Sequence, residues 1–388
     1  MQRILISERA NWKQQAEQLG FNFHTIDGER YWDESAYYQL SLRQVEDHIE
    51  TATEAVHDMA LELVDEVVDS EELLSKLAIP QNYWDWIRAS WKRRDPHLYG
   101  RMDFAYDGTG PAKLYELNYD TPTSLYEAGY FQWLWLEQQI AAGQLPAGAN
   151  QFNSIQERLL EALATLAREG LIHKNMHFGS VRESDEDRAT VQYLRDCAHQ
   201  VGINTAYVTI EDIGISADGW FTDSHDNVIR TLFKLYPLED MMREQYGPNL
   251  TSDTMQLLEP AWKAVLSNKG ILPMLWDRHK GHPNLLPAHF CDSAADTPAG
   301  MVRKPLLSRE GANIQIVTGS GEVISSDGPY NDGPAVMQAY HPLPNFDGNY
   351  PLVGSWVVAD VAAGIGIRED SSLITQNTSR FLPHVFVD

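Results

Sequence analysis

The chain has 388 residues, of which 43% are hydrophobic and 22% charged, a balance typical of a folded globular protein and not of a disordered one. Its 55 Asp and Glu against 30 Lys and Arg give a formal net charge of −25, which disfavours binding to nucleic-acid phosphates. Two cysteines, Cys197 and Cys291, are too few for a disulfide framework or a Cys-rich zinc site. With no signal-peptide run at the N-terminus and no apolar segment long enough to cross a membrane, we predict a cytoplasmic protein.

The first hundred residues are predicted to be mainly helical. Apolar side chains recur at spacings of three and four, with acidic residues around them, which indicates one amphipathic helix with a solvated acidic face: Val45, Ile49, Ala52, Val56, Met59, Leu63 and Val67. Residues 100–120 then predict two short strands around a turn at Asp107-Gly108. Residues 126–143 predict an aromatic helix that packs in the core.

Helices and strands alternate between residues 154 and 238. Ser154 and Glu157 match a capping box that opens a helix, and Gly170 is expected to close it. Strands are predicted at 177–181, 203–210 and 228–236, with a helix over 184–202, so this part is expected to form a small parallel sheet. The last 120 residues carry many Gly, Pro and short β-branched runs, which predict an α+β region with several hairpins.

Several common catalytic motifs are absent from the sequence. It has no P-loop, no complete G-x-G-x-x-G, and no H-E-x-x-H, G-x-S-x-G or C-x-x-C. A hydrolase with a Ser or Cys nucleophile therefore has no local signature here.

The densest polar chemistry lies in the predicted hairpin. Arg101 and Asp103, like Glu116 and Asn118, are two residues apart and so share one strand face. Antiparallel pairing centred near Thr109-Gly110 places Asp103 opposite Glu116 and Arg101 opposite Asn118, with Met102, Phe104, Tyr115 and Leu117 on the other face. Such oxygens suit Mg²⁺, and Arg101 could hold a phosphoryl oxygen. The alternative is an exposed hairpin with a surface ion pair.

Four basic residues of the C-terminal half stand within apolar stretches: Lys269, Lys304, Arg309 and Arg368. Buried Lys and Arg need partners, and a nucleoside triphosphate would supply them. Gly311 beside Arg309 would let a loop approach a phosphate. The alternative is that each side chain reaches solvent through its long stem.

These motifs together resemble the glutathionylspermidine synthase family, and more narrowly its short, synthetase-only members described as acid–amine ligases. The likeness rests on R-x-D, E-x-N-x-D-T-P-T-S, S-N-K-G, V-R-K-P-x-x-S-R-E-G and G-x-x-I-R-E-D, and it covers nearly the whole chain. It implies an ATP-grasp fold of permuted connectivity, in which the metal-binding strands precede the nucleotide-binding lysines. It further implies a hairpin-bearing, helical region at 1–150, a small α/β substrate-side domain at 151–240, and a nucleotide-binding region at 241–388.

The resemblance also implies roles for individual residues. Asp103, Glu116 and Asn118 would bind two Mg²⁺ ions, and ATP would contact Arg101, Lys269, Lys304 and Gln338. Arg101, Arg309 and Arg368 would hold the γ-phosphate, the acyl phosphate or the peptide substrate. Further substrate contacts would come from Thr121, Thr123, Asp185 and Glu186. The amidase domain of the bifunctional members is not expected, and Leu235 replaces a hydroxyl residue of glutathionylspermidine-forming members, which bears on the acid substrate.

The function expected from these residues is ATP-dependent ligation of a small-molecule acid to a small-molecule amine, through an acyl phosphate. The acid would be glutathione-like and the amine polyamine-like, following the family. Two alternatives use the same residues: a small-molecule phosphotransferase, and a non-catalytic polyamine- or peptide-binding protein. The sequence does not fix the oligomeric state.

Overall fold

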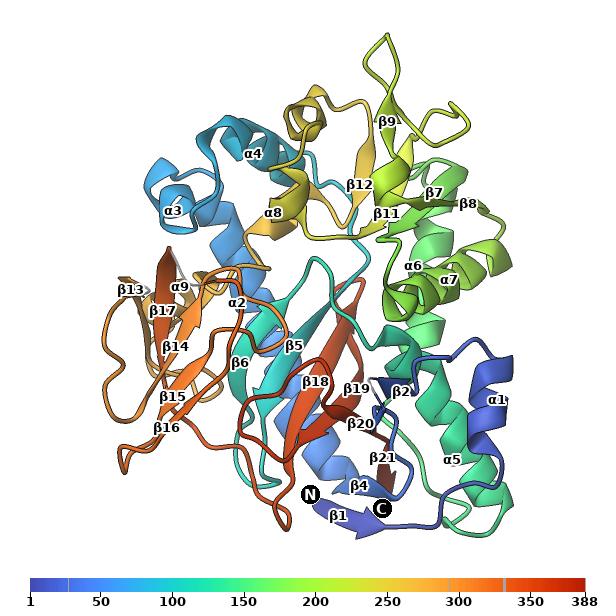
Figure 1. The fold of residues 1–388 in the computed structure, drawn as a ribbon, viewed down its shortest axis with the longest axis vertical. Helices are drawn as coiled ribbons and strands as arrows, with labels where there is room; N and C mark the ends of the chain where they lie inside the picture. Colours follow the sequence, from blue (N-terminus) through green and yellow to red (C-terminus); the bar gives the residue numbers. More distant parts are fainter. Residues whose placement is uncertain (27, 293, 331–332, 388) are drawn as a thin grey trace.

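The computed structural model describes residues 1–26, 28–292, 294–330 and 333–387. At its centre lies a five-stranded antiparallel sheet in the order β20-β19-β18-β5-β6 (Figure 1). The predicted hairpin supplies its edge, and the C-terminal region supplies the rest: β5 Tyr99–Ala105, β6 Lys113–Asn118, β18 Tyr350–Val358, β19 Val361–Asp370 and β20 Arg380–Leu382. The hairpin therefore does not stand alone, because β5 pairs with β18 along most of its length.

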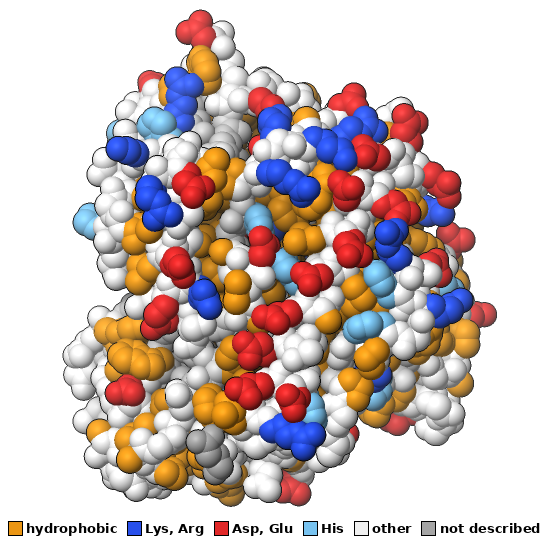
Figure 2. Space-filling view, turned by 180° about the vertical axis from the view of Figure 1, so that it is seen from behind, with side chains coloured by type: hydrophobic (Ala, Val, Ile, Leu, Met, Phe, Trp, Pro, Cys, Tyr) orange, Lys and Arg blue, Asp and Glu red, His pale blue; other side chains and the backbone are white. Residues whose placement is uncertain are grey.

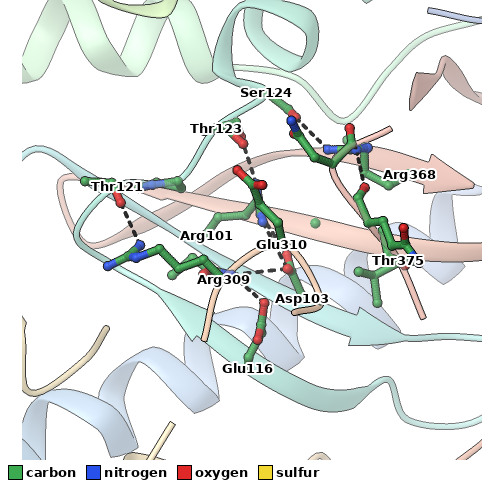
Figure 3. A pocket seen from close by; sticks show the side chains of 18 of the residues that line it. Arg101, Asp103, Glu116, Thr121, Thr123, Ser124, Arg309, Glu310, Arg368 and Thr375 are labelled. Carbon is green, nitrogen blue, oxygen red and sulfur yellow. Dashed lines mark hydrogen bonds and ion pairs between the residues drawn. The ribbon is translucent and has the colours of Figure 1, made fainter. Parts of the chain in front are cut away.

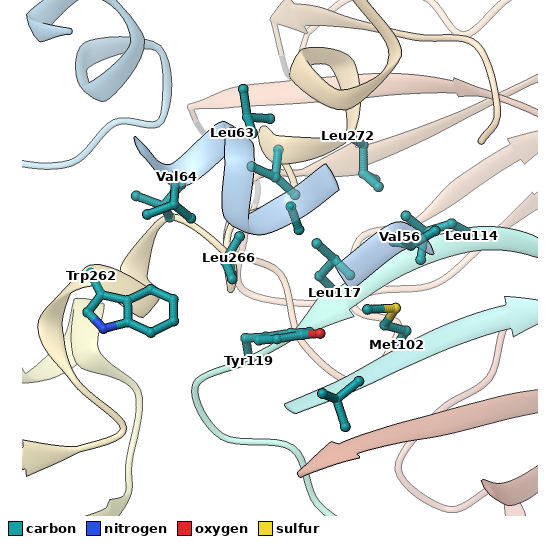
Figure 4. Close-up of a cluster of buried hydrophobic side chains, with 14 of the residues drawn as sticks. Val56, Leu63, Val64, Met102, Leu114, Leu117, Tyr119, Trp262, Leu266 and Leu272 are labelled. Carbon is teal, nitrogen blue, oxygen red and sulfur yellow. The ribbon is translucent and has the colours of Figure 1, made fainter. Parts of the chain in front are cut away.

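Helix α2 (Thr51–Val67) covers one face of this sheet. The predicted apolar stripe is buried throughout, whereas Glu54, Asp58 and Glu62 are exposed, so the prediction of an amphipathic helix with a solvated acidic face is confirmed. Its side chains meet those of the hairpin, with Val56 and Leu63 in one cluster with Met102 and Leu117 (Figure 4). Each fully buried side chain of this size contributes about 1.5–3 kcal/mol, so this contact fixes which hairpin face is left for polar chemistry.

A second antiparallel sheet has the order β13-β17-β14-β15-β16 and confirms the predicted C-terminal hairpins. Its strands are β13 Ala288–Asp292, β14 Met301–Pro305, β15 Gln315–Val317, β16 Val323–Ser325 and β17 Pro334–Ala339. It stands beside β6 in Figure 1, so the edge of the central sheet faces the inner strands of this one.

The predicted parallel unit is confirmed as a four-stranded sheet in the order β12-β11-β7-β8. It comprises β7 Asn175–Ser180, β8 Asn204–Thr209, β11 Thr231–Leu235 and β12 Gln256–Leu258, flanked by α6 Ile155–Arg168 and α7 Asp185–Gln200. Ser184 caps α7 by accepting from the Asp187 backbone N–H, and Gly170 follows α6 at φ +71°, as expected.

The capping box predicted at Ser154 is wrong. Within the part of the chain that the structure describes, the Ser154 side chain accepts no capping hydrogen bond from α6, because its hydroxyl donates to the Ala363 carbonyl of β19 at 3.0 Å. A tertiary contact thus takes the hydroxyl that the local pattern assigns to the helix.

The N-terminal region is less helical than predicted. Strand β4 (Ala36–Ser41) pairs with β1 (Gln2–Leu5) and, in parallel, with the C-terminal β21 (His384–Val387), which brings the two chain ends together (Figure 1). The remaining α-helices in the described ranges are α1 Trp12–Gln18, α3 Glu71–Lys76, α4 Trp84–Lys92, α5 Gln132–Ala141, α8 Leu238–Met241 and α9 Ile271–Arg278. Of the helices in the described ranges, none combines the length and apolarity needed to cross a membrane. Acidic side chains are spread over the face seen in Figure 2, with Lys and Arg between them.

Candidate active site

The polar face of the hairpin has the predicted register. Asp103 pairs with Glu116 and Arg101 with Asn118. The Asn118 Nδ2 donates to Asp103 Oδ2 at 3.1 Å and to Glu116 Oε1 at 3.2 Å. Two carboxylates and an amide therefore converge at one place, and the alternative of an exposed hairpin is wrong for Asp103, which is 3% exposed.

The other face of the hairpin differs at one position. A bulge after Asp103 pairs Phe104 with Leu114 and leaves Tyr115 without an opposite residue. Tyr115 therefore does not join the apolar core as predicted, and Leu114 takes that place. The Tyr115 hydroxyl instead donates to the His341 carbonyl, and its ring lines the polar side of the hairpin.

Two lysines reach the hairpin from the C-terminal half. Lys269, directly before α9, places its Nζ 3.0 Å from Glu116 Oε2. Lys304 on β14 donates to the Gln338 Oε1 of β17 at 2.7 Å and to the Tyr115 carbonyl at 2.9 Å. They are 8% and 6% exposed, so the alternative that their stems carry them into solvent is wrong.

The charges in this group alter one another's protonation. Burial alone would raise the pKa of Glu116, but the Lys269 and Lys304 ammonium groups outweigh it and hold that pKa at about 2. Burial raises the pKa of Asp103, against the opposing effect of Arg101. Burial lowers the pKa of Lys304 to about 8, although Glu116 acts in the other direction. Glu116 is thus a firmly ionised carboxylate between two cations.

Two of the predicted arginines are held by the loop that follows β6 (Figure 3). Arg101 donates to Asp103 at 2.7 Å and to the Thr123 carbonyl at 2.8 Å. Arg309 donates to the Thr121 hydroxyl at 2.8 Å and to Glu239 at 2.7 Å. Both arginines therefore line the same cavity.

Arg368 on β19 reaches this cavity without a carboxylate partner among the described residues. It donates to the backbone carbonyls of Gln376, Asn377 and Ser379 and, at 3.3 Å, to the Ser124 hydroxyl. Backbone carbonyls orient a guanidinium while leaving its full charge available to an anion.

The cleft has two compartments that share five lining residues, Asp103, Glu116, Gly311, Leu352 and Thr375. The arginine compartment encloses about 200 Å³ and contains the three arginines with Thr121, Thr123 and Leu235. The lysine compartment encloses about 90 Å³, and beside its lysines and Gln338 its wall is largely aliphatic: Val302, Ile314, Ile316, Leu343, Leu373 and Ile374. Gly311 is at φ +71°, and a Cβ there would lie 2.4 Å from the Thr375 carbonyl oxygen, so the junction needs glycine.

The acidic residues at the start of α7 line two different cavities. Asp187 lines the arginine compartment, and Glu186 lies next to the Thr123 hydroxyl. Asp185 is exposed and lines a different cavity, so the structure does not bring it to the cleft. Burial and the neighbouring Glu186 raise the pKa of Asp187 to about 7, and burial raises the pKa of Glu186.

The donor set for a divalent cation consists of oxygens alone. Within the described residues, no three His, Cys, Asp or Glu side chains cluster in a way that could hold a metal ion by themselves. Asp103 and Glu116 supply two carboxylates and Asn118 an amide, an incomplete shell of hard ligands that suits Mg²⁺ when a second molecule adds oxygens. These residues fit Mg²⁺ bound together with a polyphosphate and do not fit a resident transition metal.

Comparison with known proteins shows which family the chain belongs to. The family described as "Glutathionylspermidine synthase preATP-grasp" matches residues 3–387. The chain belongs to the glutathionylspermidine synthase family. A Haemophilus influenzae protein named "Putative acid--amine ligase" is 37% identical over 391 residues, which cover 98% of each chain.

Larger members of the family match over part of their length. The bifunctional glutathionylspermidine synthetase/amidase of Escherichia coli is 26% identical, covering 97% of this chain and 63% of that enzyme. The trypanothione synthetase of Crithidia fasciculata is 29% identical, covering 84% of this chain and 53% of its own. The chain thus spans between half and two thirds of these two relatives. A glutathione synthetase-like effector from Globodera pallida shares the fold, with a TM-score of 0.55 at 12% identity over 98% of both chains.

Proposed function

We propose that the protein is an ATP-dependent carboxylate–amine ligase with an ATP-grasp fold, in which the carboxylate hairpin precedes the nucleotide-binding lysines. The observation that carries this proposal is the position of Glu116, which contacts Lys269 and lies where the two compartments of the cleft meet. A triphosphate lying there would meet cations from both sides. The name of the 37% identical relative supports the same reaction class.

The lysine compartment suits a nucleotide. Its aliphatic wall would take the adenine ring, and Gln338 adds a polar group on the same side. Lys269 and Lys304 would contact the phosphates, as cationic clamps do in phosphoryl transfer. Lys304, with its pKa near 8, is mostly charged at neutral pH.

Asp103, Glu116 and Asn118 would hold Mg²⁺, and we propose two ions. When bound, these ions would neutralise charge on the phosphate oxygens. In the structure Asp103 pairs with Arg101 and Glu116 with Lys269, so the site is already organised for charge pairing.

The arginine compartment suits the acid substrate. Its carboxylate attacks the γ-phosphorus of ATP, which forms an acyl phosphate and releases ADP. Arg101, Arg309 and Arg368 would stabilise the negative oxygens of this transfer. Thr121 and Thr123 would contact the rest of the acid. A neutral amine then attacks the acyl carbon, the C–N bond forms and phosphate leaves.

The acidic turn of α7 suits the amine. Glu186 and Asp187 place two carboxyl groups at one edge of the arginine compartment, and the ammonium group of a polyamine-like substrate bound beside them would favour their charged forms. Leu235 lines this compartment as an apolar side chain, so an acid with an apolar group there would fit better than one that requires a hydroxyl partner.

The test is phosphate release from ATP and Mg²⁺ with a panel of acids and amines, beginning with glutathione and spermidine. A ligase releases phosphate only when acid and amine are both present. A phosphotransferase would give a stable phosphorylated product without the amine, and a binding protein would give no turnover. Glu116→Gln should remove the activity, and Glu72→Gln, at an exposed residue of α3, serves as the matched control.

A further inference from the structure

A chain of hydroxyl groups leads from the arginine compartment to a buried carboxylate. Ser124 lines the compartment, and its Oγ lies 3.0 Å from the Tyr31 hydroxyl. The Tyr31 hydroxyl donates to Glu127 Oε1 at 2.5 Å. Ser124 is held at φ +68°, an uncommon conformation for serine, so the loop accepts backbone strain at this position. Ser124 and Arg368 are seen close together in Figure 3.

Glu127 lies in the aromatic segment before α5 and is 0% exposed. Its Oε2 has no hydrogen-bond partner among the described residues. The charged groups that face it are Glu186 from α7 and Arg368 from β19, with the Tyr31 hydroxyl from the N-terminal segment. Burial and Glu186 raise the pKa of Glu127 to about 7, and the Tyr31 hydrogen bond and Arg368 oppose that effect. A carboxyl group of this kind exchanges a proton near neutral pH.

The hydrogen bonds of this chain can all point one way. Because Tyr31 donates its hydrogen to Glu127, its oxygen is free to accept the Ser124 hydrogen. Ser124 in turn accepts from Arg368 Nη1 at 3.3 Å. Its remaining lone pair is available to a group bound in the compartment, so a proton can enter at Ser124 and emerge on Glu127.

We propose that Ser124, Tyr31 and Glu127 form a proton relay that deprotonates the incoming amine, an inference that rests on the ligase function proposed above. The protonated amine gives one proton to Ser124 Oγ, while the serine proton moves to Tyr31 and the tyrosine proton to Glu127. The neutral nitrogen then attacks the acyl carbon. Its second proton leaves with the departing phosphate, so that amide, phosphate and a protonated Glu127 remain. Glu127 acts through the two hydroxyls and is a positioning residue and proton store that does not touch the substrate.

The test compares two nucleophiles in the reaction of glutathione, ATP and Mg²⁺. Spermidine must lose a proton before it attacks, whereas hydroxylamine is already neutral at neutral pH and traps the acyl phosphate as a hydroxamate. Glu127→Gln keeps an oxygen for Tyr31 but cannot take a proton. We expect it to lower kcat with spermidine by about 10²-fold, the lower end for general acid–base catalysis. The KM for spermidine and the rate with hydroxylamine should stay within about twofold of wild type.

Two further variants make the result specific. Tyr31→Phe keeps the ring that lies under Arg368 but interrupts the relay, so it should have the same effect as Glu127→Gln. Tyr38→Phe is the matched control, since Tyr38 is equally buried and donates to the buried Glu369, away from the cleft. Raising the pH should restore the spermidine rate in both relay variants, because the amine then deprotonates in solution.

The wild-type and variant results separate the two proposals. If the wild-type enzyme forms neither amide nor hydroxamate with any acid of the panel, the ligase function is refuted. If the wild-type enzyme forms both amide and hydroxamate, and Glu127→Gln slows the two reactions equally or slows neither of them, the proton relay is refuted. Loss of the spermidine reaction alone, with recovery at high pH, supports the relay.

Discussion

Replacing Lys234 by Met tests whether a buried ion pair holds the loop after β6 in place. Lys234 on β11 and Asp120 in the loop after β6 are both 0% exposed and in direct contact. Among the described residues, Asp120 has one other donor, the Leu238 backbone N–H at 2.8 Å. Removing the ammonium leaves a buried carboxylate with one neutral partner, which costs about 3–5 kcal/mol of the free energy of unfolding.

The experiment is urea unfolding, monitored by Trp fluorescence, of four proteins: wild type, Lys234→Met, Asp120→Asn and the double variant. The free energy of unfolding of the double variant should fall by less than the sum of the decreases in the two single variants, because the double variant leaves no charge unpaired. Lys92→Met, at a half-exposed lysine that contacts Asp65 and Asp69, should change the free energy of unfolding by about 1 kcal/mol or less. A cost below about 1 kcal/mol for Lys234→Met, or strict additivity in the double variant, would refute this reasoning.

Three further outcomes are expected. Glu116→Gln should abolish amide formation, since it removes the carboxylate that pairs with Lys269; turnover at saturating Mg²⁺ would contradict its metal role. Arg309→Ala should lower kcat about 10²–10³-fold, as loss of one stabilising donor does, and an unchanged kcat/KM would place Arg309 outside the site. His384 is buried, and burial lowers its pKa to about 3, so the unfolded chain takes up a proton first as the pH falls below 6.5. Between pH 6.5 and about pH 5, the free energy of unfolding of wild type should therefore fall by about 2 kcal/mol more than that of His384→Gln. Equal decreases in urea titrations would argue against a neutral buried ring.

The features that could be predicted from the sequence depend on residues close together in the chain. The pairing of Asp103 with Glu116 follows from the turn position and from strand periodicity, which is why the register is confirmed. The parallel strands followed from the alternation of apolar strands and amphipathic helices. Both signals depend on residues close in the chain.

Predictions that depended on tertiary contacts were less successful. The Ser154 hydroxyl bonds β19 and not its own helix, and a bulge moves Tyr115 off the apolar face. The side of α7 that faces the cleft depends on how the helix packs, so sequence could not separate Asp187 from Asp185. The pairing of Lys269 with Glu116 joins segments more than a hundred residues apart, and only the resemblance to a family linked them.

Glu127 shows which signal was missed. The run Y-E-A-G-Y-F predicts core contacts, and its aromatic rings do lie in the core. A single carboxylate inside such a run must either be paired or change its pKa, since an unpaired buried charge is costly. That argument needs no structure and would have selected Glu127, although its link to Ser124 through Tyr31 depends on the fold.

The pairing of charges in the cleft explains why the carboxylates and cations come from different segments. Arg101 faces Asp103, Lys269 faces Glu116 and Arg309 faces Glu239, so three of the cations expected to bind phosphate are neutralised in the structure. A triphosphate that arrived alone would compete with these carboxylates, and a divalent cation that arrived alone would compete with the cations. When the two arrive together, the divalent cation takes the place of the Lys or Arg beside a carboxylate, and the triphosphate takes the place of the carboxylate beside a Lys or Arg. No buried charge is then left unpaired. With the proposed ligase function, the hairpin and the β13–β17 sheet would therefore form a site at which magnesium and ATP favour each other's binding.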